Sequence, residues 1–304
     1  MVKECQELKD IALQVVPRVL GFGDRQDDSP TFGCFDRYYW NYKLADFPCA
    51  NFQESAFLLA QLFAGIRETR YYGKEPIARY ALAAVDFWFS VRNNDGSVNE
   101  AYPFERSFCS TAFTAAAVSE ALLLLGREYD GQLLSTALWL AKNNNYQLSN
   151  QMAAAAAALC NMYILSKDNR FLEGARRKIN YLLEAFRKHG YFPEYGGKDS
   201  GYMSLTIWYL YKYYQKSKDT DVLAAVHEAV KSLESSILEH GAIDSSKESR
   251  NTQYIYPFPS IMFSDKIRKS YLLGLAENEV ITPAWLDDRY CIQLAINYLE
   301  ASCL

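Results

Sequence analysis

Histidine is scarce in this chain of 304 residues, which contains three. No group of His, Cys, Asp or Glu residues has the spacing of a metal site. The sequence also has no G-x-G-x-x-G fingerprint and no Walker phosphate loop. We therefore expect neither a metal ion nor a cofactor.

Long hydrophobic runs are missing as well. The longest apolar stretch, residues 152–160, is mostly alanine and much shorter than the roughly 18 residues of a membrane span. The first ten residues are acidic and amphipathic, unlike a signal peptide. The seven cysteines contain no C-x-x-C pair and no disulfide framework, which is typical of free thiols in a reducing compartment. These features predict a cytoplasmic protein with no membrane partner.

Neither sign of charge dominates, because the net charge is −4 and the basic residues are scattered. No stripe of Lys and Arg interleaved with aromatic residues marks a nucleic-acid surface, so no nucleic-acid partner is expected. Aromatic residues are plentiful, with 23 Tyr and 17 Phe. Tyrosine offers a flat apolar face and a hydroxyl, which suits sugar binding but equally suits packing between helices.

What the sequence does contain is apolar residues at helical spacing in nearly every segment between glycines, without strand-like alternation. The predicted helices span residues 3–19, 51–71, 76–92, 110–125, 131–145, 148–167, 169–188, 202–216, 220–239, 265–276 and 283–300. Expected N-caps are Ser110, Ser149, Asp219 and Thr282, and expected C-terminal stops are Gly126, Gly190 and Gly241.

The links between these helices alternate in length. Short links join antiparallel neighbours, whereas the long links 93–109, 189–201 and 240–263 would fall on one rim. No Pro- or Ser-rich linker divides the chain. The sequence therefore predicts an all-α fold, an α/α toroid of antiparallel hairpins, formed as a single domain by residues 1–304.

A short motif suggests where chemistry could occur. Asn150 stands near the start of an alanine-rich helix, and about fifty residues later a glycine-rich loop precedes Tyr202. That loop carries Glu194, Tyr195 and Lys198 together with Asp199. The arrangement resembles the helical domain of the alginate lyase and heparinase-type polysaccharide lyases, over about residues 90–215.

This resemblance implies roles for two of the residues. Asn150 would help to neutralise a uronate carboxylate, and Tyr202 would transfer the proton during β-elimination, whose enolate-like anion needs hydrogen-bond donors. Gln151 stands where the family commonly has His, and Gln cannot act as a base; His189 could take that role if it faced the cleft. In the alternative interpretation, Asn150 caps its helix and Tyr202 packs at the start of the next.

Carboxylates in the predicted rim loops offer a second route. Asp95, Glu100, Glu105, Glu194 and Asp199 could supply the acid and the base of a glycoside hydrolase. Tyr102 and Arg106 of the first rim loop, with Tyr195 and Lys198 of the second, would contact the sugar. Each carboxylate could equally belong to an ordinary turn, as Asp95-Gly-Ser suggests.

The long loop 21–50 contains a dense aromatic and polar run, residues 36–43. Tyr39 and Trp40 could stack on sugar rings, and Arg37 or Lys43 could pair with a carboxylate. The same run could instead be a lid that completes the core.

Three classes of function remain open from the sequence. The first is a carbohydrate-active enzyme, a lyase or a hydrolase, whose partner is an acidic, uronate-containing oligosaccharide or glycoconjugate. The second is isoprenoid chemistry of the terpene-cyclase type, and the third is a non-catalytic toroid that binds a glycan or another protein.

Overall fold

The computed structural model describes residues 2–127 and 131–303, and it confirms the predicted all-α class: within these residues the chain forms helices and isolated bridges but no strand. The α-helices are α1 (Val2–Phe22), α2 (Arg37–Trp40), α3 (Ser55–Ala60), α4 (Glu75–Ser90), α5 (Phe108–Leu124), α6 (Leu134–Lys142), α7 (Ser149–Ser166), α8 (Asn169–His189), α9 (Ser200–Ser217), α10 (Thr220–Leu233), α11 (Ser260–Phe263), α12 (Asp265–Glu277) and α13 (Tyr290–Ala301). Four short 3-10 turns, η1 (Ala50–Glu54), η3 (Glu234–Ser236), η4 (Ser245–Lys247) and η5 (Pro283–Trp285), and one π-helical turn, η2 (Gln61–Gly65), complete the helical structure of the described residues.

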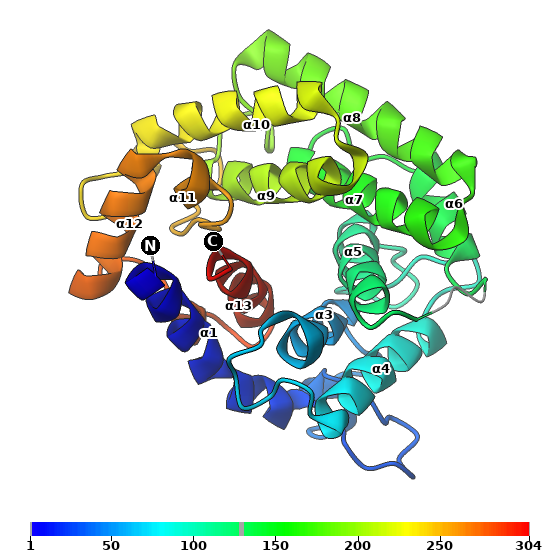
Figure 1. The fold of residues 1–304 in the computed structure, drawn as a ribbon. Helices are drawn as coiled ribbons and strands as arrows, with labels where there is room; N and C mark the ends of the chain where they lie inside the picture. Colours follow the sequence, from blue (N-terminus) through cyan, green and yellow to red (C-terminus); the bar gives the residue numbers. More distant parts are fainter. Residues whose placement is uncertain (1, 128–130, 304) are drawn as a thin grey trace.

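The helices form two nested layers around a common axis (Figure 1). The inner layer contains α3, α5, α7, α9 and α13, and the outer layer contains α1, α4, α6, α8, α10 and α12. Along the chain, α5 packs against α3 and α7, and α7 packs against α9, while α13 contacts α3 and α1. This is the layout that an α/α toroid would have.

The sequence explains which helices lie inside. Ser149–Met162 of α7 are buried on all sides, and the run of alanines 153–158 lets neighbouring backbones approach closely. The outer α8 instead buries one apolar face and carries a charged opposite face, as expected for a helix that covers a core. One continuous cluster of buried apolar side chains joins residues from Leu8 to Ala301.

The first and last long helices meet at a seam. Arg18 of α1 donates hydrogen bonds to the carboxylate of Asp288, at 2.6 and 3.1 Å, and to the carbonyl of Leu286, at 3.0 Å. Arg37 pairs with the other oxygen of Asp288. The loop before α13 is therefore fixed to both α1 and α2.

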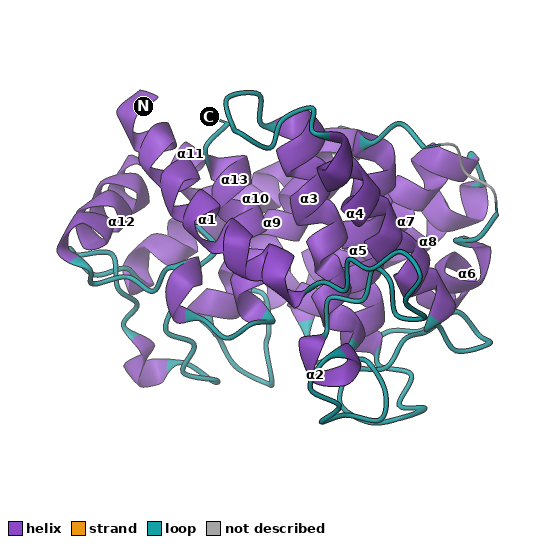
Figure 2. Ribbon diagram, turned by 90° about the horizontal axis from the view of Figure 1, so that it is seen from below, coloured by secondary structure: helices purple, strands orange, loops and turns teal. Residues whose placement is uncertain are grey.

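The two ends of the ring differ. Figure 2 shows most of the longer loops, and α2, on one side of the helical layers, where the inner helices begin. Each of the three long links predicted to share a rim has residues on this side, namely Glu100, Tyr195 and residues 250–254, but the third link also reaches the other end with Phe258 and Met262. No helix in the described part of the chain is both long and apolar enough to cross a bilayer.

Several predicted helix limits are wrong. The segment predicted as one helix over 51–71 changes from 3-10 to α to π geometry and ends at Gly65, and the predicted helix 283–300 has only the turn η5 before α13 begins at Tyr290. Ser107 rather than Ser110 caps α5, because the Ser107 hydroxyl accepts from the Ser110 amide. The stop predicted at Gly241 is also wrong, since α10 ends at Leu233, whereas Asp219 and Gly190 cap α10 and α8 as expected.

Candidate functional site

A cavity of about 550 Å³ opens where the inner helices begin. This volume falls in the usual range of small-ligand sites. Its wall contains first-turn residues of four α-helices: Cys109 of α5, Asn150 and Gln151 of α7, Gly201 and Tyr202 of α9, and Tyr290 of α13. Helix N-termini carry partial positive charge, so their convergence favours an anionic ligand.

A loop that crosses the start of α9 forms one side of the cavity. The Glu248 carboxylate accepts from the amide and the hydroxyl of Ser200, at 2.6 and 2.7 Å, and the Asp199 carboxylate accepts from the amides of Arg250 and Thr252. A Cβ on Gly201 would lie 2.3 Å from a Thr252 methyl carbon, so this approach requires glycine. These contacts place residues 250–254 along the cavity wall.

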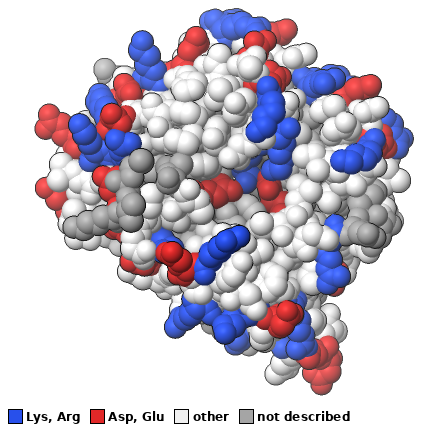
Figure 3. Space-filling view, viewed as in Figure 1, with Lys and Arg blue, Asp and Glu red and all other residues white. Residues whose placement is uncertain are grey.

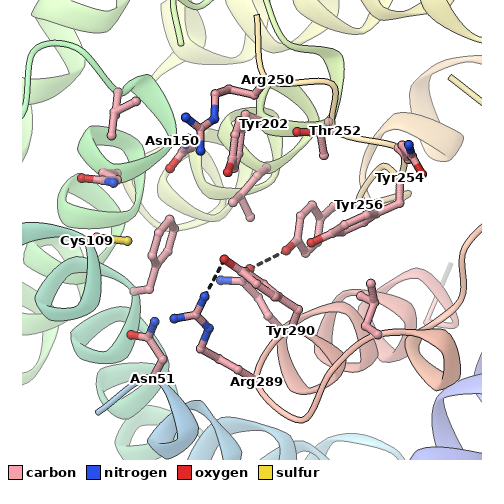
Figure 4. Close-up of a pocket in the computed structure, with 18 of the residues that line it drawn as sticks. Asn51, Cys109, Asn150, Tyr202, Arg250, Thr252, Tyr254, Tyr256, Arg289 and Tyr290 are labelled. Carbon is pink, nitrogen blue, oxygen red and sulfur yellow. Dashed lines mark hydrogen bonds between the residues drawn. The ribbon is translucent and has the colours of Figure 1, made fainter. Parts of the chain in front are cut away.

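Two arginines project toward the cavity from opposite sides (Figure 4). Arg250 lies 4.1 Å from the centre of the Tyr195 ring, a cation–π contact, and no ion pair occupies its guanidinium among the described residues. Arg289 pairs with Glu100 at 3.0 Å and donates a hydrogen bond to the Tyr290 hydroxyl at 2.7 Å. Arg250 is thus the cation left available for a ligand.

Glu100 is held firmly at the cavity wall. One of its oxygens accepts from Arg289, and from the Asn51 amide at 3.4 Å, and the other accepts from the Ser107 hydroxyl at 3.1 Å. The ion pair with Arg289 and the hydrogen bond from Ser107 fix the position of this carboxyl group. A positioned carboxylate of this kind can accept a proton or attack an electrophilic carbon.

Glu54, in η1, is the second carboxyl group of the wall and is almost fully buried. Burial raises its pKa to about 8, against weaker opposing effects of the Gln293 side chain and Arg289. The group therefore holds its proton at neutral pH. Two carboxyl groups in one cavity, of which Glu54 has a raised pKa, can divide the roles of acid and base.

Asn150 is engaged by a carboxyl group from the second predicted rim loop. Its backbone amide and its side-chain amide each donate to Glu194 at 2.8 Å, and the Thr206 hydroxyl donates to the same carboxyl at 3.3 Å. Burial raises the pKa of Glu194 to about 8. Glu194 is not part of the cavity wall, and it fixes the loop to the start of α7.

We expect Asn150→Ala to lower the free energy of unfolding by about 1–3 kcal/mol, because it leaves one buried oxygen of Glu194 without its side-chain donor. Urea unfolding followed by circular dichroism measures this change. Asn169→Ala, at an exposed asparagine in the first turn of α8, is the matched control and should change stability by less than about 0.5 kcal/mol. Equal effects of the two substitutions would contradict the role of the Asn150–Glu194 contact.

Tyr202 lines the cavity beside Asn150, as the sequence predicts, but no histidine joins them. Burial raises the pKa of Tyr202 to about 12, which makes its phenolate hard to form at neutral pH. His189 is exposed at the end of α8, where its ring faces Tyr191. The histidine that could have replaced Gln151 as a base is therefore absent from the cavity wall.

Of the other predicted site residues, Glu100 and Tyr195 line the cavity, and the rest do not. Asp95 forms a turn with Ser97 and an ion pair with Arg106, Glu105 accepts from the backbone amides of residues 100–102, and Asp199 is the buried cap of α9. Lys198 donates to Ser236, Tyr102 is exposed, and Lys43 is exposed in the loop 21–50. In the same loop Arg37 forms an ion pair with Asp288, and the Trp40 indole donates a hydrogen bond to the Phe22 carbonyl. Tyr39 is half-buried and does not line the cavity.

The prediction missed most of the wall that the C-terminal third of the chain supplies: Arg250, Tyr254, Tyr256, Arg289, Tyr290 and Gln293, together with Asn51 and Glu54. The aromatic run 254–258 and the charged triplet 287–289 were the available signals, since both precede inner elements that begin at this end. Glu54 offered none, because it stands within an apolar helical pattern.

Within residues 2–127 and 131–303, no group of three or more His, Cys, Asp or Glu side chains is arranged to hold a metal ion. No family model, no curated protein and no solved structure matches the chain.

Proposed function

We propose that this chain is a carbohydrate-active enzyme that hydrolyses a glycosidic bond in an acidic, uronate-containing oligosaccharide bound in the central cavity. The observation that carries the proposal is the pairing of the buried, protonated Glu54 with the ion-paired Glu100 in one wall. Hydrolysis of a glycoside uses one carboxyl group as a proton donor and a second one as a base or nucleophile.

The two carboxyl groups would have different roles in the reaction. Glu54 donates its proton to the glycosidic oxygen as the bond to the anomeric carbon breaks. Glu100 removes a proton from the attacking water, or attacks the anomeric carbon itself before water releases the sugar. At the end of the cycle a proton from water has returned to Glu54, and the products are two shorter sugars.

The acidic character of the substrate rests on Arg250 and on the helix N-termini. Arg250 is an exposed cation without an ion pair in the described structure, and Tyr195 orients its guanidinium by stacking. A carboxylate can accept two parallel hydrogen bonds from such a group. The tyrosines of the wall, Tyr202, Tyr254 and Tyr290, add apolar faces and hydroxyls that suit a sugar ring.

Arg250→Gln is expected to raise KM for an acidic oligosaccharide about thirtyfold, since a charge-assisted hydrogen-bonded pair contributes roughly 2 kcal/mol. The kcat should change much less, because Arg250 touches the carboxylate rather than the breaking bond. Steady-state kinetics on the acidic substrate and on its carboxyl-reduced, neutral counterpart test this. A loss of the same size on the neutral sugar would exclude carboxylate recognition by Arg250.

Elimination remains a second candidate because Asn150, Tyr202 and Arg250 meet in the same cavity. The two reactions give different products. Hydrolysis releases reducing ends without ultraviolet absorbance, whereas elimination creates a conjugated double bond that absorbs in the ultraviolet. Both signals, followed in parallel over a panel of acidic oligosaccharides, distinguish the two, and the absence of both would remove the enzymatic proposal.

A further inference from the structure

The carboxyl group of Glu54 is held by an uncharged neighbour. Gln293, near the start of α13, forms a side-chain hydrogen bond with it. Both residues line the central cavity, and both are almost fully buried, at 6% and 5% exposure. Among the described residues, no cation forms an ion pair with Glu54. The position of this buried acid therefore depends on Gln293.

Two tyrosines set the orientation of the Gln293 amide. Its oxygen Oε1 accepts a hydrogen bond from the Tyr256 hydroxyl, and its nitrogen Nε2 donates to the Tyr209 hydroxyl at 3.5 Å. An amide whose oxygen faces Tyr256 turns its N–H groups to the opposite side. The hydrogen bond from Gln293 opposes the effect of burial and lowers the pKa of Glu54, as a donor to the ionised carboxylate does. The atom that faces Glu54 is therefore Nε2.

Tyr256 is fixed in place by both α9 and α13. Its backbone amide donates to the Ser204 hydroxyl of α9 at 2.9 Å. Two residues later, the Phe258 amide donates to the Asn297 side chain at 3.0 Å, and the Phe258 carbonyl accepts from the same side chain at 2.9 Å. Asn297 lies one turn after Gln293 on α13. The same helix thus holds both the amide and the segment that carries its tyrosine partner.

The charged groups near Glu54 are paired with one another. The titratable side chains closest to it on both of its sides are Glu100, Cys109, Glu120, Tyr209, Lys212, Tyr256 and Arg289. Of these, Arg289 pairs with Glu100 at 3.0 Å, and Lys212 pairs with Glu120 at 3.4 Å. The second pair belongs to a network at the opposite end of the ring, where Figure 3 shows acidic and basic side chains near the centre of the face. The donor left to Glu54 is an uncharged amide.

We propose that Gln293 is a positioning residue: its side-chain amide holds the Glu54 carboxyl group, and the Tyr256 hydroxyl fixes the amide in the donating orientation. The proposal rests on the acid role of Glu54 in the hydrolysis proposed above. After Glu54 has passed its proton to the leaving oxygen, the N–H of Gln293 stabilises the carboxylate that remains in a buried place. Without this donor, Glu54 would release its proton less readily.

Removing the amide tests this role without a substrate. Gln293→Met keeps the length of the side chain and loses the donor, so the pH at which Glu54 is half-protonated should rise by about one pH unit. The carbonyl stretching band of the protonated carboxyl group reports this midpoint, as the infrared difference between each protein and the same protein with Glu54→Gln. Gln151→Met, a matched substitution at another buried glutamine of the cavity wall, should leave the midpoint unchanged.

Tyr256→Phe separates the orientation of the amide from its presence. The ring remains, but Oε1 loses its donor and the amide can turn, so the midpoint should rise when Gln293 is present and stay unchanged in the Gln293→Met background. An unchanged or lower midpoint in Gln293→Met, or an equal shift by Tyr256→Phe in both backgrounds, would overturn the role of Gln293. If Gln293→Met did not fold, an unchanged midpoint in Tyr256→Phe alone would overturn it.

Kinetics distinguish this inference from the proposed function. On an oligosaccharide of the acidic panel that the wild-type protein hydrolyses, Gln293→Met should lower kcat about three- to tenfold with little change in KM, since a weaker acid donates its proton less readily. A raised midpoint in a protein that hydrolyses no member of the panel would contradict the hydrolytic function and leave the contact between Gln293 and Glu54. An unchanged midpoint in an active enzyme would contradict the role of Gln293 alone.

Discussion

Replacing Glu54 by glutamine is expected to lower kcat for glycosidic hydrolysis by about a thousandfold, since a positioned general acid contributes 10²–10⁴ in rate. Glutamine has nearly the same volume and can keep the contact with Gln293, but it carries no transferable proton. Because the proposed role of Glu54 is to protonate the leaving oxygen, whereas Arg250 is proposed to bind the carboxylate, KM should change little. Release of reducing ends from an acidic oligosaccharide measures the effect.

Glu239→Gln supplies the matched control, because this glutamate is exposed and distant from the wall of the cavity. Its activity should equal that of the wild-type protein. An aryl glycoside with a good leaving group offers a further test: such a substrate needs little protonation, so it should recover much of the rate lost in Glu54→Gln. Full activity of Glu54→Gln combined with loss of activity in Tyr202→Phe would point to elimination and contradict the acid role of Glu54.

The stability of the fold should depend on pH through Glu54, and the substitution Glu54→Gln should remove this dependence. The pKa of Glu54 is raised from 4.5 to about 8 in the folded protein, so between these values the folded chain binds a proton that the unfolded chain has released. The free energy of unfolding therefore decreases as pH rises through this interval, by about 1.4 kcal/mol per pH unit for one such group. Glu194, with a pKa raised to about 8, adds a slope of the same sign.

The variant Glu54→Gln removes one of these slopes. From pH 5 to pH 7 the wild-type protein should therefore lose about 2–3 kcal/mol of stability relative to the variant. This interval lies below the pKa of Lys178, which burial lowers to about 7 and whose contribution changes mainly at higher pH. Urea unfolding of both proteins at each pH gives the difference. A constant difference across the interval would show that Glu54 titrates normally in the fold.

The periodicity of the sequence was enough to predict the long helices, because α7, α8, α9 and α10 each carry an uninterrupted apolar pattern and most are bounded by good caps. The periodicity failed where one apolar helical pattern continues through a change in the type of helix. Residues 50–65 are mostly apolar, yet their helical geometry changes from 3-10 to α to π, and the buried polar residues Gln53 and Glu54 lie in the 3-10 part. Local sequence does not determine such changes, which depend on packing against α4, α5 and α13.

The site was harder to predict than the fold for a physical reason. Asn150 and Tyr202 could be found because both stand at the starts of neighbouring inner helices. Arg250 reaches the cavity only because the 248–252 loop is held across α9 by Glu248 and Asp199, and Arg289 only because α13 returns to α3 at the end of the chain. Contacts between segments so distant in sequence leave no periodic signal. The cytoplasmic location and the uronate-containing substrate stay predictions.

The seam between α1 and α13 has a consequence for the synthesis of the chain. Because α13 emerges from the ribosome more than 260 residues after α1, α1 must wait until the residues between them have been synthesised before it can cover α13. Until then the apolar face with Val15, Val16 and Val19 has no permanent cover from α13, and α3 lacks one of its neighbours. Such surfaces are what chaperones bind on nascent proteins. The contact between α1 and α13 therefore forms late in folding. A chain truncated before residue 290 would lack α13, and the apolar surfaces of α1 and α3 left exposed would favour aggregation.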